Sequence, residues 1–66
     1  MSYTLEMHTK NGSATYHGFT IKEAWDMAMR HMDADRRNHI LWTKEQRPGY
    51  DAVWTSGSYL ISIREK

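Results

Sequence analysis

The sequence contains no cysteine, one proline and one phenylalanine among its 66 residues. The absence of cysteine excludes a disulfide framework and a thiolate metal site, and it fits a reducing compartment. No apolar run approaches the ~20 residues that a membrane-spanning helix needs. The N-terminal segment also lacks the basic and apolar regions of a signal peptide. We therefore expect a cytoplasmic protein that does not associate with a membrane.

The sequence also lacks an excess of charge of one sign. It has nine basic and eight acidic residues, so the net charge is +1. This balance argues against a protein held on nucleic acid mainly by bulk charge, although it allows a local basic patch. The length suits one domain, residues 1–66. A chain this short buries only about 60% of its unfolded surface, so large side chains must fill the core. Three Trp, four Tyr and five Met supply them.

The N-terminal third has the pattern of a β-hairpin. Apolar and polar residues alternate over residues 3–10, and Asn11-Gly12 is a strong signal for a type I′ turn. A two-residue loop at Asn11-Gly12 fixes the register. That register pairs Lys10 with Ser13, His8 with Thr15, Met7 with Tyr16, Glu6 with His17, and Leu5 with Gly18. It also places Leu5, Met7, Ala14 and Tyr16 together on the core face.

A helix is predicted to follow the hairpin. Thr20 and Glu23 have the spacing of a capping box, in which each residue's side chain accepts the backbone N–H of the other. We expect the helix to end within residues 35–38, with Asn38 in the left-handed conformation. The apolar residues fall at spacings of three and four, which predicts one core-facing stripe. That stripe consists of Ile21, Ala24, Trp25, Ala28 and Met32.

The second half favours strands over residues 40–43, 53–55 and 59–63, where β-branched and aromatic residues gather. Arg47-Pro48-Gly49-Tyr50 fits a type II turn. We predict an α+β fold, a small antiparallel sheet with one helix packed across one face. Its order is β-β-α-β-β-β, or β-β-α-β-β if Gly57 forms a bulge that merges the last two strands.

One candidate ligand site lies on the polar face of the hairpin. Glu6, His8 and His17 converge there in the predicted register, and two histidines with one carboxylate can bind zinc or iron. A polar outer face is the normal state of a half-buried sheet, however, and Glu opposite His is a favourable pair without any ion. We therefore predict no metal and no cofactor, and keep this set as a weak alternative.

A second candidate is catalytic. His31 and Asp35 are four residues apart on the helix, so the carboxylate could orient the imidazole for acid–base chemistry. Such a pair is more often a local ion pair of little energetic weight. The sequence has no nucleophile elbow, phosphate-binding loop or His-Glu-x-x-His motif. We predict that the protein is not an enzyme.

The third candidate is an interaction surface. One helix covers one face of the sheet, so the other face should keep some apolar residues for a partner or for a homodimer. We expect a binding module, a phage- or mobile-element-encoded inhibitor or modulator that masks a host protein such as a defence or nucleic-acid enzyme. The alternative is a nucleic-acid-binding module that uses the same side chains. The predicted contact residues are Arg36, Arg37, Trp42, Arg47, Tyr50 and Trp54.

Overall fold

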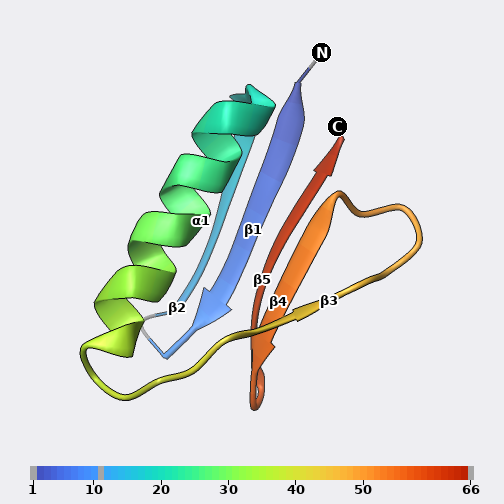
Figure 1. Ribbon diagram of the computed structural model, residues 1–66. Coiled ribbons are helices and arrows are strands. Elements are labelled where there is room, and N and C mark those ends of the chain that lie inside the picture. The colour runs from blue at the N-terminus through green and yellow to red at the C-terminus, as the bar shows by residue number, and fades with distance from the viewer. Residues whose placement is uncertain (1, 11, 66) are drawn as a thin grey trace.

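The computed structural model describes residues 2–10 and 12–65 and has the α+β architecture expected from the sequence (Figure 1). The described residues form a five-stranded antiparallel sheet in the order β2-β1-β5-β4-β3, and one helix packs on it. None of these residues belongs to a helix long and apolar enough to cross a membrane. The elements are β1 (Tyr3–Thr9), β2 (Gly12–Phe19), α1 (Ile21–Arg36), β3 (Thr43–Glu45), β4 (Ala52–Ser56) and β5 (Tyr59–Glu65).

The hairpin of β1 and β2 forms, but its predicted register is wrong by two residues. Thr9 pairs with Gly12, and Met7 therefore pairs with Ala14 instead of Tyr16. A shift of two residues leaves every side chain on its predicted face, because side chains alternate with a period of two. The apolar pattern therefore could not distinguish the two registers. Asn11, the first predicted turn residue, lies outside the described residues.

A β-bulge near the end of β2 further changes the hairpin. Leu5 pairs with Tyr16 but Tyr3 pairs with Phe19, so β2 contains one extra residue in this interval. Gly18 lies here with a φ of 79°, a left-handed conformation that glycine adopts without strain. The extra residue brings Tyr16 and Phe19 onto the same side, where their rings stack at 5.7 Å with an interplanar angle of 9°.

The capping box that starts α1 is confirmed. The Thr20 backbone N–H donates to Glu23 Oε1 at 2.9 Å, and the Glu23 N–H donates to Thr20 Oγ1 at 3.1 Å. These two bonds satisfy backbone donors that the first helical turn cannot pair internally. The sequence therefore determines the start of the helix locally.

Thr20→Ala is expected to lower the free energy of unfolding by about 1 kcal/mol, since a helix loses its N-cap acceptor. Urea unfolding followed by circular dichroism measures this change. Ser2→Ala, at an exposed position before β1, is the control and should leave the unfolding midpoint unchanged. Equal midpoints for the two variants would show that the capping box contributes nothing.

The C-terminal end of α1 differs from the prediction, because His39 and not Asn38 is left-handed, with a φ of 65°. The His39 N–H donates to the Arg36 carbonyl at 3.0 Å, and the Ile40 N–H donates to the Asp35 carbonyl at 3.1 Å. This pair of bonds is the Schellman arrangement. The Asn38 side chain instead donates to the Ala34 carbonyl at 3.4 Å. The reversal at His39 turns the chain past the helix end and toward β3 (Figure 1).

The core lies between α1 and the sheet. Trp54 of β4 is 5% exposed, and its ring meets Trp25 of α1 edge-on at 5.0 Å. Lys44 Nζ covers the Trp25 ring at 5.3 Å. Ile21 is 37% exposed, so the buried stripe is shorter than predicted and begins one turn later. The buried core residues are Leu5, Met7, Ala24, Ala28, Met32, Ala52, Trp54, Ile61 and Ile63.

In the second half of the chain, the predicted turns are confirmed, whereas the first predicted strand is wrong. The Tyr50 N–H donates to the Arg47 carbonyl at 3.2 Å and Gly49 has a φ of 83°, as the type II turn requires. Ser56 pairs with Tyr59 across a turn that contains Gly57, so the order is β-β-α-β-β-β. The strand predicted at residues 40–43 is wrong, since β3 is Thr43–Glu45. Residues 40–42 pack beside the helix end instead.

Candidate functional site

A groove of about 460 Å³ lies between the C-terminal half of α1, residues 40–42 and β4. Met32 and Trp54 form its buried floor, at 8% and 5% exposed. Met29 and Leu41 form its lip, and they are 45% and 74% exposed. The residues that line the groove are Met29, Met32, Asp33, Arg36, Ile40, Leu41, Trp42 and Trp54. It is therefore a hollow with apolar side chains open to solvent.

Helical periodicity builds one wall of this groove. Met29, Met32, Asp33 and Arg36 follow the i, i+3, i+4, i+7 spacing of one helix side, so they lie along one side of α1. The reversal at His39 brings residues 40–42 past the end of the helix, where they form the second wall. The groove is therefore a consequence of how the helix ends.

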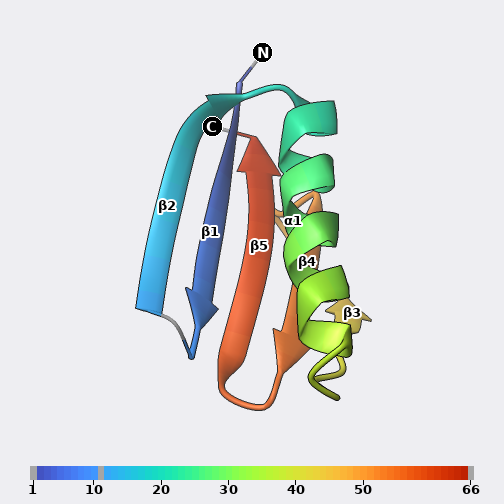
Figure 2. The same ribbon diagram turned by 90° about the vertical axis from the view of Figure 1, so that its left-hand side faces the viewer.

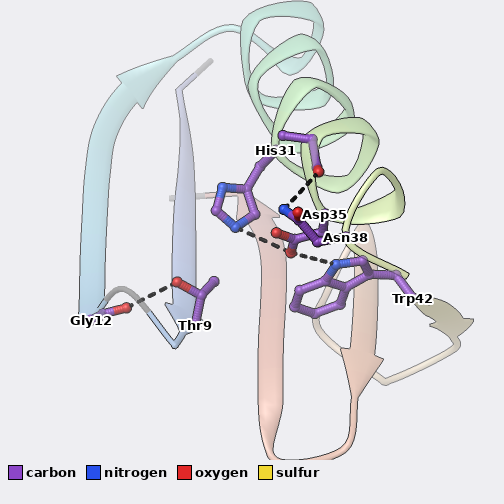
Figure 3. A network of polar contacts seen from close by, with 7 residues as sticks. Thr9, Gly12, His31, Asp35, Asn38 and Trp42 are labelled. Atoms are coloured by element: carbon purple, nitrogen blue, oxygen red, sulfur yellow. Dashed lines mark hydrogen bonds and ion pairs between the residues drawn. The ribbon is translucent and has the colours of Figure 1, made fainter. Parts of the chain in front are cut away.

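Asp35 holds the two walls together (Figure 3). Trp42 Nε1 donates to Asp35 Oδ2 at 2.9 Å, and His31 Nε2 lies 3.5 Å from the same oxygen. The Asp35 side chain is only 12% exposed, and its backbone carbonyl accepts the N–H of Ile40. One residue thus anchors both the indole and the backbone of the returning segment.

His31 and Asp35 therefore lie side by side as the sequence predicts, and their contact is a packing contact at the helix end. The 3.5 Å separation is long for a hydrogen bond, and His31 Nε2 is buried with no hydrogen-bond partner among the described residues. The carboxylate oxygen that it faces already accepts the Trp42 indole N–H. This geometry orients Trp42 toward the helix end rather than presenting an imidazole to a substrate.

The structure brings together three of the six predicted contact residues. Trp42, Trp54 and Arg36 line the groove. Arg37 is exposed beside Arg36 and Asp33, just outside it. Trp54 belongs to the floor of the groove and to the core, so little of its surface is accessible.

The other two predicted contacts lie elsewhere. Arg47 and Tyr50 flank the turn between β3 and β4, which Figure 1 shows away from α1. Arg47 pairs with Glu45, with Nη2 and Oε1 3.0 Å apart. Sequence reasoning missed Met29, Ile40 and Leu41 as groove residues. The composition of residues 40 and 41 favours a strand, and Met29 lies at helical spacings of four from Trp25 and three from Met32, which is the signal that could have found it.

The charges at the rim of the groove are exposed and mostly basic. Arg36 Nη2 lies 4.0 Å from Asp33 Oδ1, and both side chains are more than half exposed, at 76% and 65%. An exposed pair of this kind contributes about 0–1 kcal/mol. Arg37 adds a second positive charge next to it. Among the exposed charges at this end of the helix, two arginines therefore lie beside one aspartate, whereas the Asp35 carboxylate is buried against Trp42.

The weak metal alternative on the hairpin does not assemble. Thr15, and not His17, lies opposite Glu6, and His17 Nδ1 instead lies 3.3 Å from Thr4 Oγ1. The described residues contain no group of three or more His, Cys, Asp or Glu side chains that could hold a metal ion. The register shift and the bulge are the physical reasons for the difference.

A hydroxyl, an imidazole and a carboxylate do line up on that polar face. His8 Nδ1 lies 2.9 Å from Ser13 Oγ, and His8 Nε2 lies 3.9 Å from Glu6 Oε2. Arg64 Nε also approaches Glu6, at 3.7 Å from Oε1. Acyl transfer by such a set needs an oxyanion site and shelter from water. Ser13 and His8 are exposed on an open sheet, and neither they nor Glu6 line the groove beside α1.

The uncovered face of the sheet carries less exposed apolar surface than expected. Val53 on this face is 1% exposed and pairs with the polar Ser62 of β5. Among the described residues, the exposed large apolar side chains are Tyr16, Ile21, Met29, Leu41 and Tyr50. Two of these five line the groove beside α1, so the groove is where exposed apolar side chains gather around a hollow.

No family model matches the sequence, and no curated protein and no solved structure gives a significant match.

Proposed function

We propose that the protein is a binding module that receives an apolar side chain of a partner protein in the groove beside α1. The observation that carries this proposal is the pairing of a 74% exposed Leu41 and a 45% exposed Met29 with a floor of Met32 and Trp54. A groove of about 460 Å³ falls within the roughly 300–1,000 Å³ typical of binding sites. Flexible methionines also adapt to the shape of an inserted side chain.

The charge at the rim specifies the partner further. Arg36 and Arg37 outnumber Asp33 beside the groove, so the favoured segment carries an aliphatic or aromatic residue with acidic neighbours. Rim charges of this kind act mainly on the association rate and on specificity, whereas the buried apolar contact supplies most of the affinity. The partner is thus a protein with an apolar residue exposed among carboxylates.

Nucleic-acid binding remains the alternative, and the positions of the aromatic residues favour a protein partner. Single-stranded nucleic acid needs accessible ring faces near cationic side chains. Trp54 is 5% exposed and Trp42 is tied to Asp35 through its indole nitrogen. Tyr50 is 39% exposed, but it lies on the turn after β3, away from Arg36 and Arg37. These positions leave the arginines without an exposed aromatic ring beside them.

The mechanism we propose is steric. A small cytoplasmic protein that occupies an apolar patch on a host enzyme prevents that enzyme from using the same surface. The small size and the single compact α+β unit suit an inhibitor or modulator encoded by a phage or another mobile element. In this setting the protein needs a complementary surface and no chemistry of its own.

Leu41→Lys tests the proposal, because it places a charge on the most exposed apolar residue of the groove. We expect the affinity for the partner to fall about tenfold or more, which corresponds to about 1.4 kcal/mol or more. The stability should change by no more than about 0.5 kcal/mol, since the site is on the surface. The measurement is affinity capture from nuclease-treated bacterial lysate, followed by titration of the captured protein.

Ile21→Lys is the matched control, because Ile21 is a 37% exposed apolar residue at the other end of α1. A protein captured by the wild type and by Ile21→Lys, and lost by Leu41→Lys, supports the groove as the binding site. Equal capture by all three proteins would contradict it. Capture by the wild type that is seen in untreated lysate but not in nuclease-treated lysate would favour the nucleic-acid alternative.

A further inference from the structure

The two edges of the sheet differ in how they are protected. β2 forms one free edge along its whole length (Figure 2). Its eight residues, GSATYHGF, include no Lys, Arg, Asp, Glu or Pro. β3 forms the other edge with three residues, and two of these are Lys44 and Glu45. Exposed edges are normally protected by short length, charge or proline, so β3 is protected and β2 is open.

We propose that β2 pairs with β2 of a second copy, antiparallel, so that the two sheets become one. This interaction surface is independent of the groove, which lies on the β4 side of α1. It also differs from the expected homodimer through the uncovered sheet face. A symmetric dimer requires a strand that is complementary to itself under a two-fold rotation, and the residues of β2 meet this condition.

The hairpin determines which backbone groups of β2 point outward. Thr9 and Gly12 close the two-residue loop, and such a closing pair exchanges hydrogen bonds across the hairpin. Alternation then directs the backbone of Ala14 toward β1 and the backbone of Ser13 and Thr15 toward the open edge. Thr15 is the central outward residue, so a two-fold axis at Thr15 uses the free donors and acceptors.

This register also matches the side chains. Thr15 faces Thr15 of the partner subunit, and Ser13 faces the partner subunit's His17, so hydroxyls and an imidazole meet on the polar side. Ala14 faces the partner subunit's Tyr16 on the helix side. Thr–Thr and aromatic–apolar pairs are favourable across strands, and no charge opposes a like charge. Tyr16, which is 38% exposed, would be covered by this pairing.

The stacked rings of Tyr16 and Phe19 are a second reason to place another copy of the chain at the β2 edge. Tyr16 and Phe19 stack beside the open edge. In the register centred on Thr15, the two Tyr16 residues are diagonal neighbours across the axis, which is within reach of aromatic side chains. A second copy therefore covers both the backbone of the edge and its exposed ring.

Thr15→Lys, measured by sedimentation velocity over a wide range of concentration, tests the proposal. The wild type should approach twice the monomer mass as concentration rises, whereas Thr15→Lys should stay monomeric because two lysines meet on the axis. Thr43→Lys, which adds the same charge to the β3 edge, should dimerise like the wild type. Thr15 is exposed, and circular dichroism of Thr15→Lys verifies that this variant retains the fold.

A charge swap tests the register itself. Thr15→Glu alone should be monomeric, and an equal mixture of Thr15→Lys and Thr15→Glu should dimerise again. A wild type that stays monomeric at every concentration would overturn the proposal. Dimerisation of Thr15→Lys alone would also overturn it and would point to the uncovered sheet face. A mixture that stays monomeric would contradict the pairing of Thr15 with Thr15.

Discussion

Trp54→Ala is expected to remove a large share of the protein's free energy of unfolding. Trp54 is 5% exposed, contacts Trp25 edge-on at 5.0 Å and forms the floor of the groove. Truncating a buried Trp costs about 3–5 kcal/mol, because the lost contacts and the cavity both contribute. At roughly 0.05–0.15 kcal/mol per residue, a chain of 66 residues has only about 3–10 kcal/mol to lose.

Urea unfolding followed by far-ultraviolet circular dichroism measures this loss. Leu41→Ala is the matched control, because it truncates a large apolar residue of the same groove that is 74% exposed. We expect Leu41→Ala to change the free energy of unfolding by no more than about 0.5 kcal/mol. If Trp54→Ala were as stable as Leu41→Ala, Trp54 would belong to an accessible surface and not to the core.

Asp35→Ala is the second variant with a large expected effect. The substitution removes the acceptor of the Trp42 indole N–H, at 2.9 Å, and the carboxylate that His31 faces. A buried donor left without a partner costs about 1–3 kcal/mol. The segment 40–42 also loses its side-chain anchor, so we expect the groove to loosen as well. Asp33→Ala, an exposed neighbour on the same helix, should have little effect.

A double-mutant cycle with Trp42→Phe isolates the contact between Asp35 and Trp42. Phenylalanine keeps an aromatic ring but has no N–H, so Asp35→Ala in that background should cost less than in the wild type. The difference between the two costs is the coupling energy, expected within about 0.5–3 kcal/mol for residues in contact. Strictly additive costs would show that the 2.9 Å contact contributes nothing to stability.

Much of the fold could be predicted because short segments determine it. Thr20 and Glu23 specify the helix start through bonds that span three residues. Pro48 and Gly49 specify a turn through their own backbone preferences. The hairpin faces followed from alternation, but its register did not, since registers two residues apart give the same faces. The bulge near Gly18 is a further feature that alternation could not indicate.

The candidate site depended on contacts that sequence spacing does not reveal. Residues 40–42 have the composition of a strand, but the bond from Trp42 to Asp35 keeps them beside the helix. The same bond holds one wall of the groove, in which Leu41 is 74% exposed. Tryptophan is a common interface anchor, but in this small protein Trp54 is buried in the core. The residue types were therefore informative, whereas their placement depended on tertiary packing.

The central claim is that the groove beside α1 contacts a partner protein, and site-specific photo-crosslinking tests it most directly. A photoreactive phenylalanine analogue is placed at Leu41 in one protein and at Ile21 in another, and both are irradiated in the same lysate. The account predicts a discrete adduct with one protein from position 41 and none from position 21. The same adduct in equal yield from both positions, or no adduct from position 41, would contradict it.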